Sequence, residues 1–173
     1  MKKLFYTIFI LLCVVLITGC NNQKENKDNT VDKYEQLSNY LIDNGWEKSE
    51  DSPYNFSLKV RNVLDDNGKP INIDWYNLDI KKMNIQRTTR ISQLSATTTD
   101  YSLKSNIATG NFTLLNEKDE WDKYVTFTYD FNSGSLTIDD DSSSSLCTKQ
   151  SIELKEKLEE ILEDANLSVE DFK

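Results

Sequence analysis

Histidine is absent from this chain of 173 residues. The chain therefore lacks the residue type that most often acts as a general base or binds zinc. Nucleophilic pairs of serine or cysteine with histidine are excluded as well. The sequence contains no Gly-x-Ser-x-Gly, Ser-x-x-Lys or Gly-x-x-x-x-Gly-Lys motif, so nothing in it indicates the common hydrolases or a phosphate-binding loop.

Cysteine is scarce, and its three positions are Cys13, Cys20 and Cys147. Two of them lie near the start of the chain, so Cys147 is the only thiol in the remainder. Unpaired cysteines behave as small apolar side chains and are among the most buried residue types. We therefore expect Cys147 to be buried.

Positive charge is in deficit, with 20 Lys and Arg against 29 Asp and Glu and a formal charge of −9. Nucleic acids are bound mainly through Lys and Arg contacts to phosphate, so an acidic chain argues against them as partners. Anionic lipid headgroups are repelled for the same reason. The excess of acidic residues is typical of a surface that keeps an exported protein soluble.

Long hydrophobic runs are lacking except for one, Leu4 to Ile17, which follows Lys2 and Lys3. A helix that spans a membrane needs about 20 apolar residues, so this run is short for that role. Its length and its positive flank match the core of a signal peptide. It ends in Leu16-Ile17-Thr18-Gly19-Cys20, and the next six residues are all polar.

These first 20 residues resemble the signal peptide and lipobox of bacterial lipoproteins. The resemblance implies that Cys20 carries diacylglycerol and that the bond before it is cut. It implies a signal peptide over 1–19, a lipidated flexible tether over 20–29 and one globular domain over 30–173. The membrane is then a partner through the acyl chains on Cys20, and the domain faces outside the cytoplasm. Cys147 would be left without a disulfide partner in its own chain.

Helical spacing of apolar residues predicts two helices. The first runs from about Thr30 to Asn44, with Asn29 or Thr30 as N-cap and Gly45 and Trp46 as its C-terminal signal. Its expected apolar stripe is Val31, Tyr34, Leu37, Leu41 and Ile42. The second runs from about Lys149 to Ala165, with a short turn after Ser168. Its expected stripe is Leu154, Leu158, Ile161, Leu162 and Ala165.

Period-two alternation and turn residues between the helices predict six to eight strands with short connections. The expected strands include 78–87, 89–94 and 99–107, with Gly110 at an element end, and a final hairpin around Asn132-Ser133-Gly134. The fold class is therefore α+β, an antiparallel β-meander covered by an N-terminal and a C-terminal helix. A small β-barrel with a C-terminal helix is the alternative.

Three groups of residues are candidates for a site. Trp75 with Asp74, Tyr76 and Asn77 could line a ligand groove, although aromatic residues in strands more often pack in cores. The carboxylates Glu117, Asp119 and Glu120 beside Trp121 could hydrolyse a glycan, and a solvated loop is the preferred interpretation. The acidic stretches 65–68 and 139–141 lack the spacing of a calcium loop. No cofactor or metal is indicated.

Two functions remain open at this point. The first is a non-enzymatic binding or accessory domain of the cell envelope, whose partner is another envelope protein, a peptide or a small ligand. The second is a carboxylate-dependent hydrolase of cell-wall glycan. We favour the first, because the residue types of most catalytic sites are missing.

Overall fold

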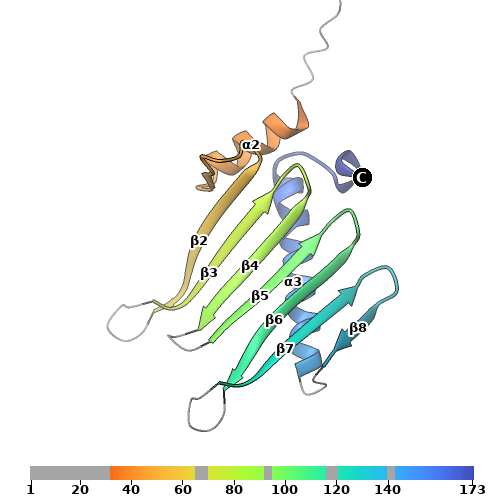
Figure 1. Ribbon diagram of the computed structural model, residues 1–173. Coiled ribbons are helices and arrows are strands. Elements are labelled where there is room, and N and C mark those ends of the chain that lie inside the picture. Colours follow the sequence, from red (N-terminus) through yellow and green to blue (C-terminus); the bar gives the residue numbers. More distant parts are fainter. Residues whose placement is uncertain (1–31, 65–69, 92–94, 116–120, 140–142) are drawn as a thin grey trace, which may run out of the picture. The chain divides into compact units, whose positions relative to one another are not determined.

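An eight-stranded antiparallel sheet forms the centre of the fold, and each strand pairs with its neighbours in sequence (Figure 1). The computed structural model describes residues 32–64, 70–91, 95–115, 121–139 and 143–173. The strands are β1 (Glu47–Lys48), β2 (Asn55–Leu64), β3 (Pro70–Asp79), β4 (Asn84–Ile91), β5 (Ser95–Ser102), β6 (Ile107–Leu115), β7 (Trp121–Asp130) and β8 (Ser135–Ile138). The predicted antiparallel meander is therefore confirmed.

The sheet is open, so the barrel alternative is wrong. Strand order runs from β1 to β8, and these two strands form the opposite edges of the sheet. β1 has two residues and β8 has four. Edge strands this short offer few backbone groups for closing a sheet on itself, and they also limit unwanted pairing with other chains.

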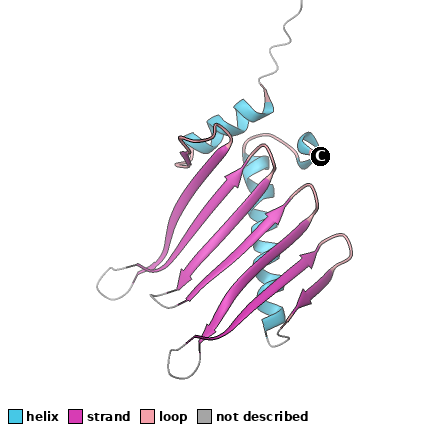
Figure 2. Cartoon of the chain, viewed as in Figure 1, coloured by secondary structure: helices cyan, strands magenta, loops and turns pink. Residues whose placement is uncertain are grey.

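Helix α3 (Ser144–Asp164) lies across one face of the sheet and contacts β4 to β8 (Figure 2). The helix begins at Ser144, which is five residues before the predicted start, and it includes the buried Cys147. Cys147 packs in a cluster with Phe112, Val125 and Phe127 of the sheet. The predicted stripe is confirmed, since all of its members are buried: Leu154, Leu158, Ile161, Leu162 and Ala165.

Helix α2 (Lys33–Asp43) begins after Asp32, whose side chain accepts a hydrogen bond of 3.1 Å from the backbone of Tyr34. The predicted caps Asn29 and Thr30 lie outside the described residues. Leu37 and Leu41 are buried in the main core, as expected. Ile42 is 48% exposed, so its predicted burial is wrong.

The C-terminus of α2 has the predicted glycine stop. Gly45 has a φ of +83°, and its amide donates to the carbonyl of Ile42. The amide of Trp46 donates to the carbonyl of Leu41 at 3.0 Å. This pair of bonds is the Schellman arrangement, and the buried Trp46 supplies its apolar contact.

The short 3-10 helix η2 (Val169–Phe172) ends the chain against α2. Ser168 and Asp171 form a reciprocal capping box at its start. The ring of Phe172 is buried, and its centroid lies 5.7 Å from that of Tyr34 in an edge-on contact. The predicted turn after Ser168 is confirmed.

Two predicted strands, 78–87 and 99–107, each contain a turn instead. β3 ends at Asp79 and β4 begins at Asn84, with Met83 at a φ of 55°. β5 ends at Ser102 and β6 begins at Ile107, with Asn106 at a φ of 57°. Gly110 lies inside β6 and not at an element end.

Strand alternation gives the sheet two chemically different faces. The covered face lies against α3 and carries a row of buried residues across neighbouring strands: Phe56, Leu78, Ile85, Tyr101 and Ala108. The open face carries a polar row in the next register position: Ser57, Asn77, Gln86, Asp100, Thr109, Thr128 and Thr137. No helix in the described part of the chain lies over this second face.

None of the helices that the structure describes combines the length and the apolar character needed to cross a bilayer.

Candidate functional site

A groove of about 710 Å³ lies on the open face, at the end of the sheet formed by β1 to β5. Its floor comes from neighbouring strands, and the segment from Glu47 to Glu50 lines its edge. The side chains that share the open face in this groove are Asn55, Ser57, Asn77, Asp79, Asn84, Gln86 and Asp100. Hydrogen-bonding groups therefore dominate its lining.

The strand register places these side chains in two parallel rows. Ser57, Asn77, Gln86 and Asp100 are opposite one another on β2 to β5. In the same way, the second row consists of Asn55, Asp79 and Asn84 on β2 to β4. Because the rows belong to paired strands, their spacing is fixed by backbone hydrogen bonds and not by loops.

The carboxylate of Asp100 is held by two amides of β4. Asn84 Nδ2 donates to Oδ1 at 2.5 Å, and Gln86 Nε2 lies 3.4 Å from Oδ2. The amide groups are planar and keep their own oxygens available as acceptors. Asp100 is therefore oriented by its neighbours and remains at the surface of the groove.

The carboxylate of Asp79 is also engaged. Its Oδ1 accepts from the backbone amides of Lys81 and Lys82 at 3.1 and 2.9 Å. Its Oδ2 lies 3.2 Å from Lys82 Nζ. This side chain closes the turn that connects β3 to β4, and so it fixes one end of the groove.

Charge in the groove is negative in balance, with Glu47, Glu50, Asp79 and Asp100 against Lys48 and Lys82. The Lys48 side chain stands on the other side of the sheet, because its Nζ lies 6.0 Å from the centroid of Phe56 on the covered face. The open side of the groove is therefore more acidic than the lining alone suggests.

Trp75 lies on the open face beside the groove. It is on β3, two residues from Asn77 on the same face, a separation of about 7 Å along a strand. The indole is half-buried, and Lys59 Nζ lies 5.2 Å from its ring centroid. Trp75 and Asn77, two of the residues singled out in the sequence, thus share one surface.

Asp74 and Tyr76 belong to the covered face, so the structure does not bring them together with Trp75. Asp74 is 1% exposed. Its Oδ1 accepts a hydrogen bond of 2.6 Å from Thr89 Oγ1, and its Oδ2 lies 3.1 Å from Arg87 Nη2. The period of two in a strand separates these neighbours in sequence.

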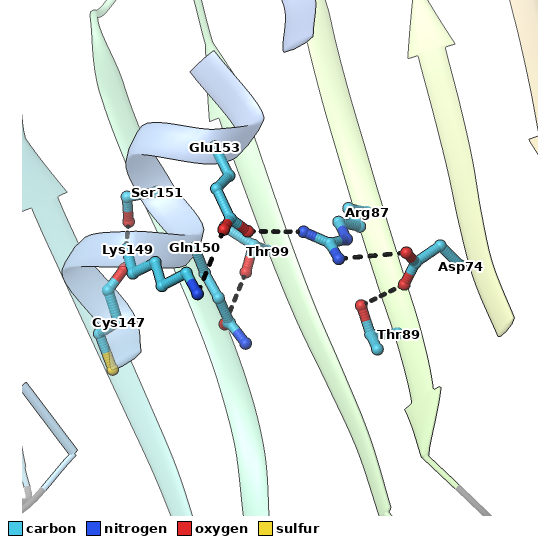
Figure 3. A network of polar contacts seen from close by, with 9 residues as sticks. All are labelled: Asp74, Arg87, Thr89, Thr99, Cys147, Lys149, Gln150, Ser151 and Glu153. Carbon is cyan, nitrogen blue, oxygen red and sulfur yellow. Dashed lines mark hydrogen bonds and ion pairs between the residues drawn. The ribbon is translucent and has the colours of Figure 1, made fainter. Parts of the chain in front are cut away.

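Arg87 connects Asp74 to helix α3. Its second terminal nitrogen, Nη1, lies 3.0 Å from Glu153 Oε2 (Figure 3). Burial would lower the pKa of the guanidinium, but the hydrogen bond to Asp74 and the nearby negative groups raise it overall. The guanidinium carbon lies 5.9 Å from the ring centroid of Tyr76, whose pKa burial raises. This network joins sheet to helix.

Several other predicted candidates lie outside the described residues. These are Glu117, Asp119 and Glu120, the stretch 65–68, and Asp140 and Asp141. Trp121 begins β7. Among the residues that the structure does describe, no three Cys, Asp or Glu side chains are grouped as metal ligands. Cys147 is buried as predicted, and burial raises the pKa of its thiol to about 11.

The sequence did not single out Gln86 and Asp100 as site residues. Both are polar positions on the open face of β4 and β5, opposite each other. The signal that could have found them is the alternation of Asn84, Gln86 and Thr88 on one strand. This alternation was hidden because the sequence pattern predicted a single strand over 78–87.

Comparison of the chain with protein-family models, with curated proteins and with solved structures finds no match.

Proposed function

We propose that this chain is a membrane-anchored lipoprotein outside the cytoplasm, and that its domain is a non-enzymatic binding domain of the cell envelope. The anchor is the lipid on Cys20, and the binding site is the groove on the open face. The observation that carries the binding role is the asymmetry of the sheet. One face is covered by α3, whereas the other holds a groove lined by side chains of consecutive strands.

The groove is suited to recognition because its polar groups are held before a ligand arrives. The Asp100 carboxylate is fixed by Asn84 and Gln86, and the Asp79 carboxylate is fixed by the β3–β4 turn. Polar groups that are already oriented lose less conformational freedom on binding. The same contacts engage both carboxylates as acceptors, which suits orientation of a ligand better than proton transfer.

The tether gives this domain a defined reach. The composition of 21–29 is that of a flexible chain, and about ten such residues have a typical end-to-end distance of roughly 17 Å. The groove would then stay close to the bilayer and could still turn toward partners. A ligand in the cell envelope is therefore the natural occupant.

Photo-crosslinking in intact cells tests the binding role. A photoreactive amino acid replaces Ser57 in the groove, and in a matched control it replaces Thr128, which is also exposed on the open face but lies on β7. Irradiation should link the full chain covalently to a ligand when the photoreactive residue is at position 57, and should not do so when it is at position 128. The adduct is detected by mass spectrometry of the purified chain. Equal adducts from both positions, or none from position 57, would contradict the proposal.

A further inference from the structure

The uncharged side chains of the groove offer donors and acceptors in nearly equal measure. Asn55, Asn77 and Gln86 each carry an amide NH₂ and a carbonyl oxygen, and Ser57 adds a hydroxyl. A ligand that fits such a surface must itself both donate and accept at closely spaced positions. Hydroxyl groups do this, since each has one donor and two acceptor lone pairs.

Anionic ligands do not fit the charge of this site. Four carboxylates and two lysines line the groove, and one of those lysines, Lys48, stands over the opposite face. The whole chain is also acidic, with a formal charge of −9. Phosphate-bearing polymers and nucleic acids would therefore be repelled.

Cationic ligands are attracted by the acidic balance of the groove, but its carboxylates offer only weak ion pairs. Asp79 is already paired with Lys82, and Glu47 and Glu50 are exposed at the edge. The amides that donate to Asp100 are neutral, so they orient this carboxylate without pairing its charge. The uncharged part of the groove is its row of amides and hydroxyls.

Trp75 adds an aromatic surface beside this polar row, one register position away on the open face. Its indole lies on the same face as Asn77, about 7 Å further along β3. The flat ring could stack against the apolar face of a sugar ring whose hydroxyls reach Asn77 and Gln86. Lys59 stands over the indole now, but a cation–π contact at an exposed site is weak and is easily displaced.

We propose that the groove binds a neutral glycan, built of hexose or N-acetylhexosamine units, with one ring on the amide row and the next on Trp75. This assignment rests on the proposed binding function of the same groove and names its ligand class. A cationic peptide is the competing ligand, and the experiment below separates the two.

The experiment is isothermal titration calorimetry on the full chain, held in a detergent that has no sugar headgroup. The neutral probes are cellobiose, maltose and N,N′-diacetylchitobiose, and the charged probe is tetralysine. At least one neutral disaccharide should bind, in the millimolar range or tighter. Asn77→Ala and Trp75→Ala should each weaken that binding at least fivefold, while Thr128→Ala on the same face should leave it unchanged. Unfolding in urea checks that the variants are folded.

Three results would overturn the glycan assignment. They are no binding of any neutral disaccharide, binding of tetralysine in their place, or binding that the two groove variants leave intact. The binding function itself is judged separately by the crosslinks from position 57. Adducts at that position without disaccharide binding would reject the glycan and retain the binding domain.

Discussion

Asp74 and Arg87 show at the scale of single residues how the covered face accommodates charge. Asp74 is 1% exposed, and its carboxylate oxygens contact Thr89 and Arg87. A buried carboxylate that loses its cation costs several kcal/mol, because the charge stays in a medium that solvates it poorly. The Asp74–Arg87 pair therefore stabilises the fold because each residue compensates the charge of the other.

Replacing Arg87 by Met should destabilise the fold by about 3–5 kcal/mol, since it leaves Asp74 without its guanidinium. The double variant with Asp74→Asn should recover part of that loss, because the uncompensated charge is removed. Unfolding in urea measures both. Glu153→Gln is the control, as that carboxylate is 41% exposed and its contact with Arg87 is worth about 1 kcal/mol or less. Equal losses for Arg87→Met and Glu153→Gln would contradict this account.

Gly110 has a steric role that its place in β6 explains. A Cβ at this position would lie 2.4 Å from the Phe127 ring and 2.6 Å from the carbonyl oxygen of Thr98. The missing side chain thus gives Phe127 room on the covered face.

Gly110→Ala should destabilise the fold by about 1–3 kcal/mol, as is usual for overpacked cores. Phe127→Leu in the same chain should relieve part of this clash, although the backbone contact remains. Gly134→Ala is the comparison, because Gly134 has open space around it and a φ of +71°. Its cost should be about 1–2 kcal/mol and should not depend on Phe127. Urea unfolding of Gly110→Ala and Gly134→Ala, each with and without Phe127→Leu, and of Phe127→Leu alone decides whether Gly110 and Phe127 are coupled.

At the scale of elements, the ends of the helices differ in how far sequence determines them. The end of α2 was predictable, because Gly45 and Trp46 act through bonds to the preceding turn. The start of α3 was not, since a run of serines locally favours a turn. Packing of Cys147 against Phe112, Val125 and Phe127 extends that helix, and those contacts come from distant strands.

The turns inside the predicted strands 78–87 and 99–107 were hidden by burial. Ile80, Met83 and Leu103 lie in turns and yet belong to the main core. Apolar residues in a turn continue the alternation of the flanking strands, so the pattern shows no break. By contrast, the connection between Asn132 and Gly134, with its polar residues, was visible as a turn.

Only a small part of the candidate site could be predicted. Trp75 and Asn77 were named, and the strand period places them on one face. Which face is covered could not be foreseen, because β3 carries an aromatic residue on each face, Trp75 on the open one and Tyr76 on the covered one. The groove also needs the register of four strands, which depends on contacts distant in sequence.

The reactivity of Cys147 measures how readily the first turns of α3 open. Its thiol is buried, and burial raises its pKa to about 11, so little thiolate exists near neutral pH. In a chain with Cys13→Ser and Cys20→Ser, iodoacetamide at about pH 8 should modify Cys147 at least ten times more slowly than in the urea-unfolded chain. Rates are followed by mass spectrometry. Equal rates would show that this end of α3 opens freely.

At the scale of the whole molecule, buried acids make stability depend on alkaline pH. Burial raises the pKa of Tyr101 from 10.0 to about 12, with a smaller contribution from Glu159. Between these two values the unfolded chain binds fewer protons than the folded one. Stability is therefore complete below about pH 10 and falls as the pH rises toward 12.

Tyr101→Phe should make the fall in stability above pH 10 shallower. Below that pH the variant should be less stable by about 1 kcal/mol, because it loses the hydrogen bond of 3.0 Å from Tyr101 to Asn106 Oδ1. Urea unfolding at a series of pH values measures the gap between the two proteins. The gap should narrow as the pH rises above about 10. Parallel curves over this range would show that Tyr101 is not the responsible group.

In the proposed function, anchoring through Cys20 makes the acyl chains the domain's main contact with the bilayer. Each buried methylene contributes about 0.8 kcal/mol, and two or more chains hold a protein stably in a bilayer. The acidic surface adds no attraction to anionic headgroups. Cys20→Ser should thus remove the chain from the detergent-extracted membrane fraction. The chain should then accumulate as a precursor that carries no lipid and migrates more slowly on a gel.

Cell fractionation and metabolic labelling with a fatty acid measure this change. Cys147→Ser is the matched control, because it removes a thiol that lies buried in the domain, and it should keep both the label and the membrane fraction. Loss of the label in Cys147→Ser, or an unchanged label in Cys20→Ser, would contradict lipidation at Cys20. The domain would then not be held at the bilayer, and the proposed tether would no longer restrict which ligands reach the groove.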